Sequence, residues 1–276
     1  PTFDLPDSEL RDGFTFPEDS SLVKDFSIYV YDADGDNLEI NVLGNQFINV
    51  DIQGLVVNLS SARNYNGSEV IIFTVNDGSG FVTASDDVTV EVTPVNDAPL
   101  LPEISDIETD ENQIVVFSVL GEDVDGDELI YESETTSPEI STKFVFNQLV
   151  LTPDENWYGT SEITVIANDY FLYDTTSFIL NVLPVNNVPE ISSMRLTTSE
   201  DELLNITFSG SDIDGDELTF EVDQYPEHGS IIGNVYSPDA NYNGTDLFTY
   251  IAFDGEAFSD SSPVLITRTL YPVVER

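Results

Sequence analysis

The stretch DADGD, residues 32–36, decides the organisation of this chain because its pattern returns twice. It recurs as DVDGD at residues 123–127 and as DIDGD at residues 212–216, so the period is about 90 residues. Each copy sets three aspartates within five positions, on a chain that is already strongly acidic. Carboxylates at this spacing repel one another unless a positive partner or the solvent screens them.

Three further markers follow the first in a fixed order. The second marker is NYNG at 64–67, NWYG at 156–159 and NYNG at 241–244. The third is TVNDG at 74–78, VIANDY at 165–170 and IAFDG at 251–255, and the fourth is TPVNDAP at 93–99 and LPVNNVP at 183–189. LYPVVER at 270–276 is interpreted as a decayed fourth marker. The markers predict three domains, residues 1–97, 98–187 and 188–276.

The residues between the markers predict β-strands. VTVEV alternates Val88, Val90 and Val92 with polar residues, and the same period of two runs through SEITVIA at 161–167 and SFILNV at 177–182. DFSIYVY at 25–31 is also predicted as a strand, with Phe26, Ile28 and Val30 on one face. Short alternating strands with Gly, Asn and Pro between them predict an all-β chain of three immunoglobulin-like sandwiches. Arg268 aligns with Val90 and Leu180, which predicts an edge strand or a slipped register in repeat three.

Composition narrows the function. The 276 residues include 53 acids and 7 bases, for a formal net charge of −46, with no cysteine and 40% hydrophobic residues. This charge argues against nucleic acid and against anionic membrane surfaces as partners, and favours cations. No apolar run approaches the roughly 18 residues of a membrane span, so direct membrane insertion is not expected. The opening PTFDL predicts a fragment cut from a longer chain.

The aspartate motifs are candidate calcium sites. Calcium takes six to eight oxygen ligands in flexible geometry, and the glycine lets the backbone bend towards an ion. An EF-hand is excluded, because that loop needs Gly at position six and Glu at position twelve, whereas Gly35 is fourth and Leu43 is twelfth from Asp32. The alternative is a solvated turn, in which Asp36, Asp127 and Asp216 accept hydrogen bonds from nearby amides.

Other acids recur in phase with these motifs. An acidic pair lies some fifteen residues upstream of each motif, and one aspartate follows each second marker; these residues are Glu18-Asp19, Asp110-Glu111, Glu200-Asp201, Asp77, Asp169 and Asp254. The strand pattern would bring them to the ends of the sandwiches, beside the short linkers. A cation site between neighbouring domains is therefore expected.

With these residues in place, the chain resembles the cadherin-like tandem repeats of large bacterial surface and secreted proteins. The resemblance is carried by PEDSS, YDADGDNLEI, NYNGSEVIIFTVNDG and VTVEVTPVNDAP in repeat one, and by their counterparts in the other two. It implies Ca²⁺ at each domain junction. The implied ligands come from the first strand's end, an acid pair late in the domain, the linker, and the next domain.

For the first junction the resemblance implies Glu18 or Asp19, Asn96, Asp97, Asp123, Asp125 and Asp169. Ala62 and Arg63 stand where its acid pair belongs. For the second junction it implies Asp110 or Glu111, Asp154, Glu155, Asn186, Asn187, Asp212, Asp214 and Asp254. Asn187 replaces a linker aspartate there. Asp32, Asp34, Asp36 and Asp77 would face a preceding domain, and Asp127 and Asp216 complete the second and third aspartate motifs.

Three functions are weighed. The first is a calcium-binding spacer of an extracellular or cell-surface bacterial protein, whose partners are calcium ions and neighbouring repeats. The second is an adhesive recognition module for a glycan or a protein, favoured if exposed aromatics cluster on one repeat; ring stacking by Tyr65, Trp157 and Tyr242 is weighed against plugging of a core end. The third is halophilic adaptation with scattered acids. Catalysis is not expected, because the acids recur in triplicate and His228 is the one histidine.

Overall fold

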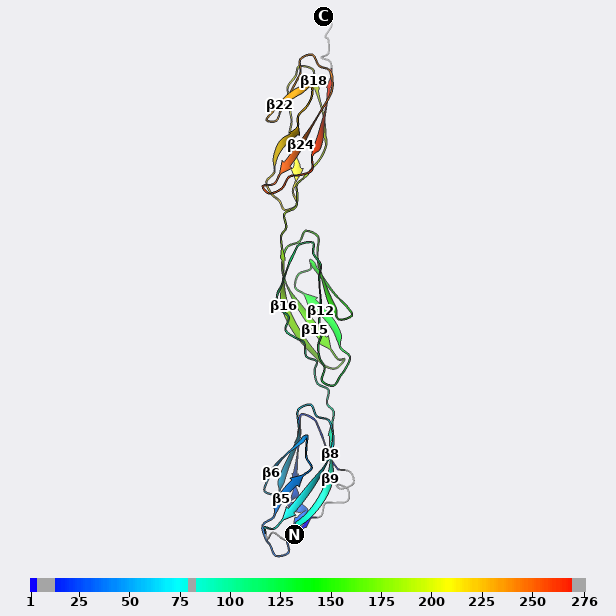
Figure 1. Cartoon of the computed structure of the whole chain (residues 1–276), viewed down its shortest axis with the longest axis vertical. Helices are drawn as coiled ribbons and strands as arrows, with labels where there is room; N and C mark the ends of the chain where they lie inside the picture. Colours follow the sequence, from blue (N-terminus) through cyan, green and yellow to red (C-terminus); the bar gives the residue numbers. More distant parts are fainter. Residues whose placement is uncertain (4–12, 79–82, 270–276) are drawn as a thin grey trace.

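The computed structural model describes residues 1–3, 13–78 and 83–269, and it shows three β-sandwiches in a row (Figure 1). The predicted all-β class and the end-to-end arrangement are confirmed. The domain boundaries after residues 97 and 187 stay predictions. The segment 270–276, interpreted above as a decayed marker, lies outside the described residues.

Each sandwich pairs a four-stranded sheet with a three-stranded one. In repeat one the orders are β2-β9-β8-β5 and β3-β7-β6, and β1 pairs with β4. The strands are β1 (Thr2–Phe3), β2 (Phe14–Pro17), β3 (Ser21–Asp25), β4 (Val30–Tyr31), β5 (Glu39–Leu43), β6 (Ile48–Gln53), β7 (Val56–Ser61), β8 (Gly67–Asn76) and β9 (Thr83–Thr93). The first long strand, β2, runs parallel to the last, β9, whereas the other pairs are antiparallel.

Repeats two and three have the same topology. In repeat two the sheets are β10-β16-β15-β12 and β11-β14-β13. Its strands are β10 (Ile107–Asp110), β11 (Val115–Ser118), β12 (Ile130–Thr135), β13 (Ile140–Val145), β14 (Gln148–Pro153), β15 (Gly159–Asn168) and β16 (Tyr173–Leu183). In repeat three the sheets are β18-β25-β24-β21 and β19-β23-β22, with β17 paired to β20. Its strands are β17 (Glu190–Ile191), β18 (Met194–Ser199), β19 (Leu204–Asn205), β20 (Gly210–Ser211), β21 (Thr219–Gln224), β22 (Gly229–Ile232), β23 (Val235–Pro238), β24 (Gly244–Phe253) and β25 (Ser262–Thr269).

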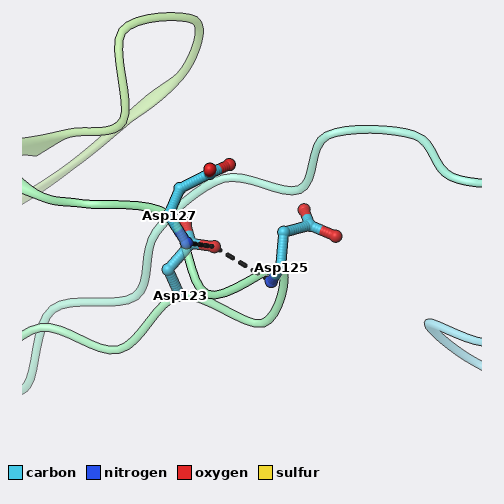
Figure 2. Close-up of side chains that lie close together, drawn as sticks. All are labelled: Asp123, Asp125 and Asp127. Atoms are coloured by element: carbon cyan, nitrogen blue, oxygen red, sulfur yellow. Dashed lines mark hydrogen bonds between the residues drawn. The ribbon is translucent and has the colours of Figure 1, made fainter.

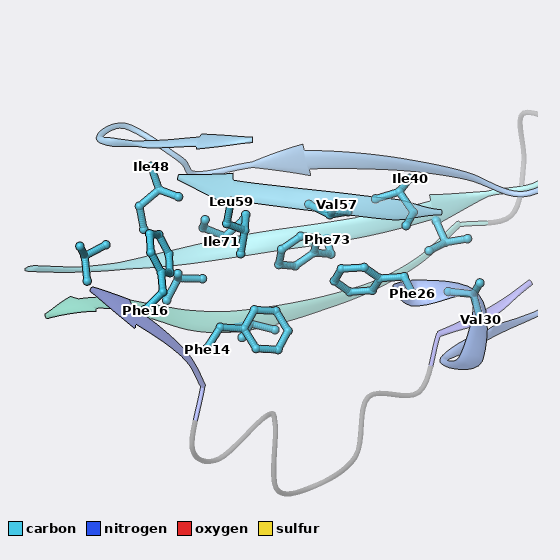
Figure 3. Close-up of a cluster of buried hydrophobic side chains, with 14 residues drawn as sticks. Phe14, Phe16, Phe26, Val30, Ile40, Ile48, Val57, Leu59, Ile71 and Phe73 are labelled. Carbon is cyan, nitrogen blue, oxygen red and sulfur yellow. The ribbon is translucent and has the colours of Figure 1, made fainter. Parts of the chain in front are cut away.

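The alternating apolar residues form a separate core in each repeat. In repeat one Val88, Val90 and Val92 are buried in the same core cluster as Phe14 and Phe73. Figure 3 shows the rings of Phe14 and Phe73 in this core. The predicted inward faces of residues 163–167 and 178–182 in repeat two are buried as well. Because each core lies within its own repeat, neighbouring repeats contact each other through the linkers and the loops beside them.

The strand predicted over residues 25–31 is wrong in part. Phe26–Ile28 forms a 3-10 turn, in which Asp25 accepts a hydrogen bond from the amide of Ser27 at 2.9 Å. The turn breaks the alternation: Phe26 is buried, but Ile28 is 75% exposed. A local aspartate–amide bond therefore overrides a period-two pattern.

The prediction for Arg268 is also wrong. Arg268 pairs with Gly244, as Val92 pairs with Gly67, so it corresponds to Val92 and not to Val90. Its strand β25 lies between β18 and β24, away from the sheet edges, and the β24–β25 ladder has no register shift.

Buried Arg268 is held by a polar cluster that belongs to repeat three. Its Nη1 donates to the carbonyl oxygen of His228 at 2.8 Å, and its guanidinium carbon lies 4.1 Å from the ring centre of Tyr242. Asp246, also buried, has an oxygen 3.9 Å from Nη2 of Arg268. Asp246 also accepts the hydroxyl of Tyr236 at 2.8 Å, and burial, followed by this hydrogen bond, raises the pKa of Tyr236. The cluster explains how a charged side chain is tolerated at a core position.

The three aromatics of the second marker have equivalent places. Tyr65, Trp157 and Tyr242 are all half-buried, and each ring lies over the glycine two residues later. A Cβ on Gly67 would come within 3.0 Å of the Tyr65 hydroxyl, and a Cβ on Gly159 within 3.0 Å of the Trp157 ring. Tyr65 and Trp157 pack against the cores of their repeats, whereas Tyr242 stacks on His228 and lies against Arg268.

Removal of the Asp246 carboxylate should destabilise repeat three. Asp246→Ala leaves the amides of Glu227 and His228 without this acceptor, and it leaves the hydroxyl of Tyr236 with the longer bond to the His228 carbonyl oxygen alone. We expect a loss of about 3 kcal/mol in the unfolding of repeat three, measured by urea titration. The control Glu221→Ala, which removes an exposed acid on β21, should change stability by less than about 0.5 kcal/mol. Equal effects of the two substitutions would contradict this role of Asp246.

Candidate metal centre at each domain junction

The parallel pairing of the first and last strands brings an acid to each linker. Just after β2, the amide of Glu18 donates to the carbonyl oxygen of Thr93 at 2.9 Å, at the end of β9. Glu111 makes the same contact with Leu183 at 2.8 Å. Glu18 and Glu111 are therefore equivalent, and both are 2% exposed.

This equivalence means that the acidic pair Asp110-Glu111 of repeat two is offset by one residue from the pairs of the other two repeats. Asp19, Asn112 and Asp201 follow the three glutamates and share a positive φ of 55°, 62° and 60°. Asp110, which the sequence pairs with Glu111, instead lies exposed in β10 opposite Leu183. Glu18 and Glu111 are thus the buried acids beside the two linkers, and the charge of Asp19 also acts on Asp97 at the first.

Glu18 is only half satisfied. Its Oε1 accepts the amide of Val95 at 2.9 Å and the side-chain amide of Asn66 at 3.3 Å. Its Oε2 is buried and has no hydrogen-bond partner. A buried carboxylate oxygen without a donor is costly unless a cation lies beside it.

The linker ties the first repeat to the second. Asn96 donates its side-chain amide to Oδ2 of Asp169 at 2.8 Å, and the backbone amide of Asp97 donates to Oδ2 of Asp125 at 2.8 Å. Oδ2 of Asp97 is buried without a partner. Burial, then the nearby charges of Asp19 and Asp125, raise the pKa of Asp97, because these surroundings disfavour its ionised form.

The aspartate motif of repeat two forms a tight loop that faces this linker (Figure 2). Oδ1 of Asp123 accepts the amides of Asp125 at 2.9 Å, Gly126 at 3.1 Å and Asp127 at 3.2 Å. The first aspartate of the motif, and not the third, thus accepts the hydrogen bonds that stabilise the turn. Oδ2 of Asp123 is buried without a partner, and one oxygen from each of the three aspartates lies within 4.8 Å of the others.

The second junction repeats this geometry with one exchange. Asn186 donates to Asp254 at 3.0 Å, and the amide of Asn187 donates to Oδ2 of Asp214 at 2.7 Å. The side-chain amide of Asn187 also donates to Oε1 of Glu111 at 3.0 Å. Asn187 therefore places a neutral hydrogen-bond donor where the first linker has a carboxylate.

Unpartnered oxygens remain at the second junction too. Oε2 of Glu111 and Oδ2 of Asp212 are buried without partners. One oxygen from each of Asp212, Asp214 and Asp216 lies within 4.8 Å of the others. The two junctions thus present the same kind of donor set.

The acid pair late in the domain distinguishes the junctions. Glu155 lines a cleft of about 610 Å³ together with Asn187 and Asp212. At the first junction Arg63 occupies the position of Glu155 and lines a smaller cleft of about 310 Å³ with Asp97 and Asp123. Asp154 is exposed, and its carbonyl oxygen accepts the amide of Trp157.

The first repeat's own motif is less compact. Asp32 accepts the amides of Asp34 at 2.9 Å and Asp36 at 3.2 Å. Among the described residues, the three side chains do not form a close oxygen cluster of the kind found in the other two repeats. Asp77 is half-buried near the end of β8.

Asp169 and Asp254 anchor the loops beside the linkers. Hydrogen bonds from the amide of Leu172 and from the Asn96 side chain hold the pKa of Asp169 below its usual value. The amide of Ala257 has the largest such effect on the pKa of Asp254. Both carboxylates are therefore kept in the charged form that a cation requires.

This donor set fits a calcium ion. The candidate ligands are hard oxygens, and several are buried without donors. Among the described residues, the groups of three or more close acidic oxygens are those of the second and third aspartate motifs, and Glu18 and Asp97 belong to neither. The linker is joined to the first of these motifs by the hydrogen bond from the Asp97 amide to Asp125. The sequence indicated the aspartates but not the unpartnered oxygens, which depend on the local turns. The contacts of Val95 and Asn66 with Glu18 were not expected from any sequence signal.

The fold and these junctions define a class: tandem immunoglobulin-like and cadherin-like repeats. The bacterial Ig domain family matches residues 96–178 and 186–267, which is more than half of the chain. The chain therefore belongs to the bacterial Ig domain family. Such domains are typically extracellular and typically not enzymes, and tandem arrays of them suggest a repeat or adhesion-type role. A search of curated proteins gives no match.

The solved structures that match this chain have low sequence identity to it. A mouse protocadherin-24 fragment is 18% identical, with a TM-score of 0.46, over 92% of this chain and 96% of that one. An I-band fragment of titin is 12% identical, with a TM-score of 0.34, over 94% and 95%. An endo-fucoidan hydrolase of glycoside hydrolase family 107 is 16% identical, with a TM-score of 0.31, over 94% of this chain. The chain spans 43% of the length of that hydrolase.

In the described part of the chain, no helix has the length and apolarity needed to cross a bilayer.

Neutralising one unpartnered oxygen should stabilise the cation-free chain. Glu18→Gln keeps the acceptor for Val95 but removes the buried negative charge. In chelator we expect a gain of about 1 kcal/mol, measured by thermal melting. The matched control Glu91→Gln, on an exposed face of β9, should leave the melting temperature unchanged. Destabilisation by Glu18→Gln in chelator would show that this oxygen already has a partner.

Proposed function

We propose that this chain is a calcium-binding spacer segment of a large extracellular bacterial surface protein, with Ca²⁺ at the domain junctions stiffening the rod. The observation that carries the proposal is the set of buried, unpartnered carboxylate oxygens at each junction. At the first junction, Glu18, Asp97 and Asp123 supply these oxygens from one repeat, the linker and the next repeat.

The residues that would hold the ion at the first junction are Glu18, Asp97, Asp123, Asp125 and Asp169. Bound Ca²⁺ would supply the positive charge that these oxygens lack. The chain itself sets their directions: Asn96 fixes the Asp169 carboxylate, and the Asp97 amide fixes that of Asp125. Without a cation, like charges repel across the linker and favour bending. Ion binding to the aligned state adds stability by mass action.

At the second junction the residues would be Glu111, Asp212, Asp214 and Asp254, with Glu155 at the rim of the cleft. Asn187 removes one charge from this set, and its amide already neutralises part of the field of Glu111 and Asp214. Weaker ion binding is expected at this linker than an aspartate at position 187 would give.

The halophilic and enzymatic alternatives receive less support, and the rings of the second marker do not favour the recognition alternative. The equivalent half-burial of Tyr65, Trp157 and Tyr242 favours a structural role for these rings in all three repeats. The gathering of phased acids at the junctions argues against a general halophilic adaptation. No catalytic role is proposed, because the acids act in repeated sets at equivalent positions. The neighbouring repeats of the longer chain and calcium ions are the proposed partners.

Small-angle scattering with and without calcium tests the proposal. In millimolar calcium the maximum dimension should increase relative to chelator, because alignment at the junctions lengthens the rod. Extracellular calcium modules bind at roughly 10⁻⁴ to 10⁻³ M, so 10 mM calcium should raise the melting temperature by about 10 °C. Magnesium at the same concentration controls for ionic strength. If both quantities stay constant, calcium stiffening is excluded.

The double variant Asp123→Asn and Asp125→Asn should abolish the calcium effect at the first junction. Asparagine at 123 keeps an acceptor for the turn amides, so repeat two should still fold. Calorimetric titration should show fewer bound ions than in the unchanged chain. The control is Asp32→Asn with Asp34→Asn, which alters the same motif outside both described junctions. Loss of binding at the junctions in the control would refute the assignment.

Asn187→Asp should make the second junction more dependent on calcium. The substitution brings a third charge beside Glu111 and Asp214 and removes the donor that bridges them. We expect a lower melting temperature in chelator and a larger rise on calcium addition. Asn205→Asp, at an exposed position on β19, is the control. An unchanged calcium response in Asn187→Asp would count against a cation at this linker.

A further inference from the structure

The hairpin that joins β15 to β16 presents four apolar side chains to solvent. Tyr170, Phe171, Leu172 and Tyr173 are consecutive, and they are 70%, 80%, 41% and 69% exposed. Exposed apolar residues are common singly, but a run of four that includes three aromatic rings is a patch, and such patches mark interaction sites. The hairpin has no part in the junction chemistry proposed above, except through Asp169 at its base.

Position 170 distinguishes this hairpin from its counterparts in the other repeats. Tyr170 has a φ of 82°, in the left-handed region that disfavours residues with a Cβ. The equivalent positions are Gly78 in repeat one, with a φ of 75°, and Gly255 in repeat three, with a φ of 109°. The other two repeats thus have the residue that suits the turn. Repeat two has an exposed aromatic ring at this position. Both the positive φ and the exposure of the ring are unfavourable, and the ring gains no core contact.

The backbone of the hairpin is held firmly. Oδ1 of Asn168 accepts the amide of Tyr170 at 2.6 Å, and Oδ1 of Asp169 accepts the amides of Phe171 and Leu172 at 2.7 Å. The other oxygen of Asp169 accepts the side-chain amide of Asn96 from the linker. The rings are therefore carried on a pre-organised support, which lowers the entropy lost when a ligand binds.

We propose that this hairpin binds an uncharged polysaccharide, whose sugar-ring faces pack against Tyr170, Phe171 and Tyr173. A net charge of −46 repels anionic polysaccharides, nucleic acids and acidic lipids, but it has no such effect on a neutral glycan. A stable protein interface takes some 20–30 residues a side, far more than four exposed residues supply. Sugar rings can be bound by a few stacked aromatics whose phenol hydroxyls also form hydrogen bonds to sugar hydroxyls.

Affinity electrophoresis of the whole chain tests the proposal. The gels contain xyloglucan, galactomannan or mixed-linkage β-glucan, with hyaluronan as the anionic comparison. We expect retardation by at least one uncharged polysaccharide and none by hyaluronan. The double variant Tyr170→Gly and Phe171→Ala should bind about tenfold more weakly, the effect expected from lost ring stacking. Because glycine occupies position 170's equivalent in the other repeats, this variant should fold, which a thermal melt checks.

A matched control separates the hairpin from exposed aromatics in general. Phe146 is 95% exposed at a φ of 57°, in the turn between β13 and β14 of the opposite sheet, where the other repeats have Gly54 and Gly233. Phe146→Gly should bind as the unchanged chain does. The proposal is overturned if no uncharged polysaccharide retards the chain, if the double variant binds equally well, or if the control loses binding. Sedimentation with phosphatidylcholine vesicles that depends on Tyr170 and Phe171 would overturn it in favour of a membrane surface.

Discussion

Glu18, Asp97 and Asp123 each direct a buried carboxylate oxygen into the first junction without a hydrogen-bond donor to meet it. This negative charge without hydrogen-bond donors is the constraint on which the account of the molecule depends. The parallel pairing of β2 with β9 forces Glu18 to the linker, and the turn of residues 123–127 forces its first aspartate inward. Each fold element thus brings charge to a place where charge is unfavourable in isolation, and where a shared divalent cation would offset it.

The two junctions share the same linker contacts but differ in local charge. Arg63 lies beside Asp97 and Asp123, and its positive charge opposes the rise in the pKa of Asp97. The second junction has Glu155 at that position, but Asn187 replaces the linker carboxylate. At the first junction Arg63 lowers the local negative charge and Asp97 keeps it. At the second junction Asn187 lowers it and Glu155 keeps it. Repeat three departs further, because Arg268 and Asp246 bring an ion pair into its core. Repeats of one fold can thus differ in electrostatics while their sheets stay the same.

Much of the fold could be predicted from the sequence, because the period of two and the recurring turn residues act locally. Val88, Val90 and Val92 are buried as the alternation requires. The prediction for Ile28 was wrong because the Asp25 side chain caps a 3-10 turn. The prediction for Arg268 was two positions off because its register is set by the pairing with Gly244, and its burial depends on partners distant in sequence. The candidate ligands could be named from spacing and resemblance. Which of their oxygens lack donors depends on contacts such as that of Val95 with Glu18, which only the folded chain reveals.

A crystal structure of the chain grown in 10 mM calcium tests the central claim most directly. The account predicts anomalous density at both junctions, with an ion about 2.3–2.6 Å from Oε2 of Glu18, Oδ2 of Asp97 and Oδ2 of Asp123 at the first. Water alone between these oxygens, or carboxylates turned away from one another towards solvent, would contradict it.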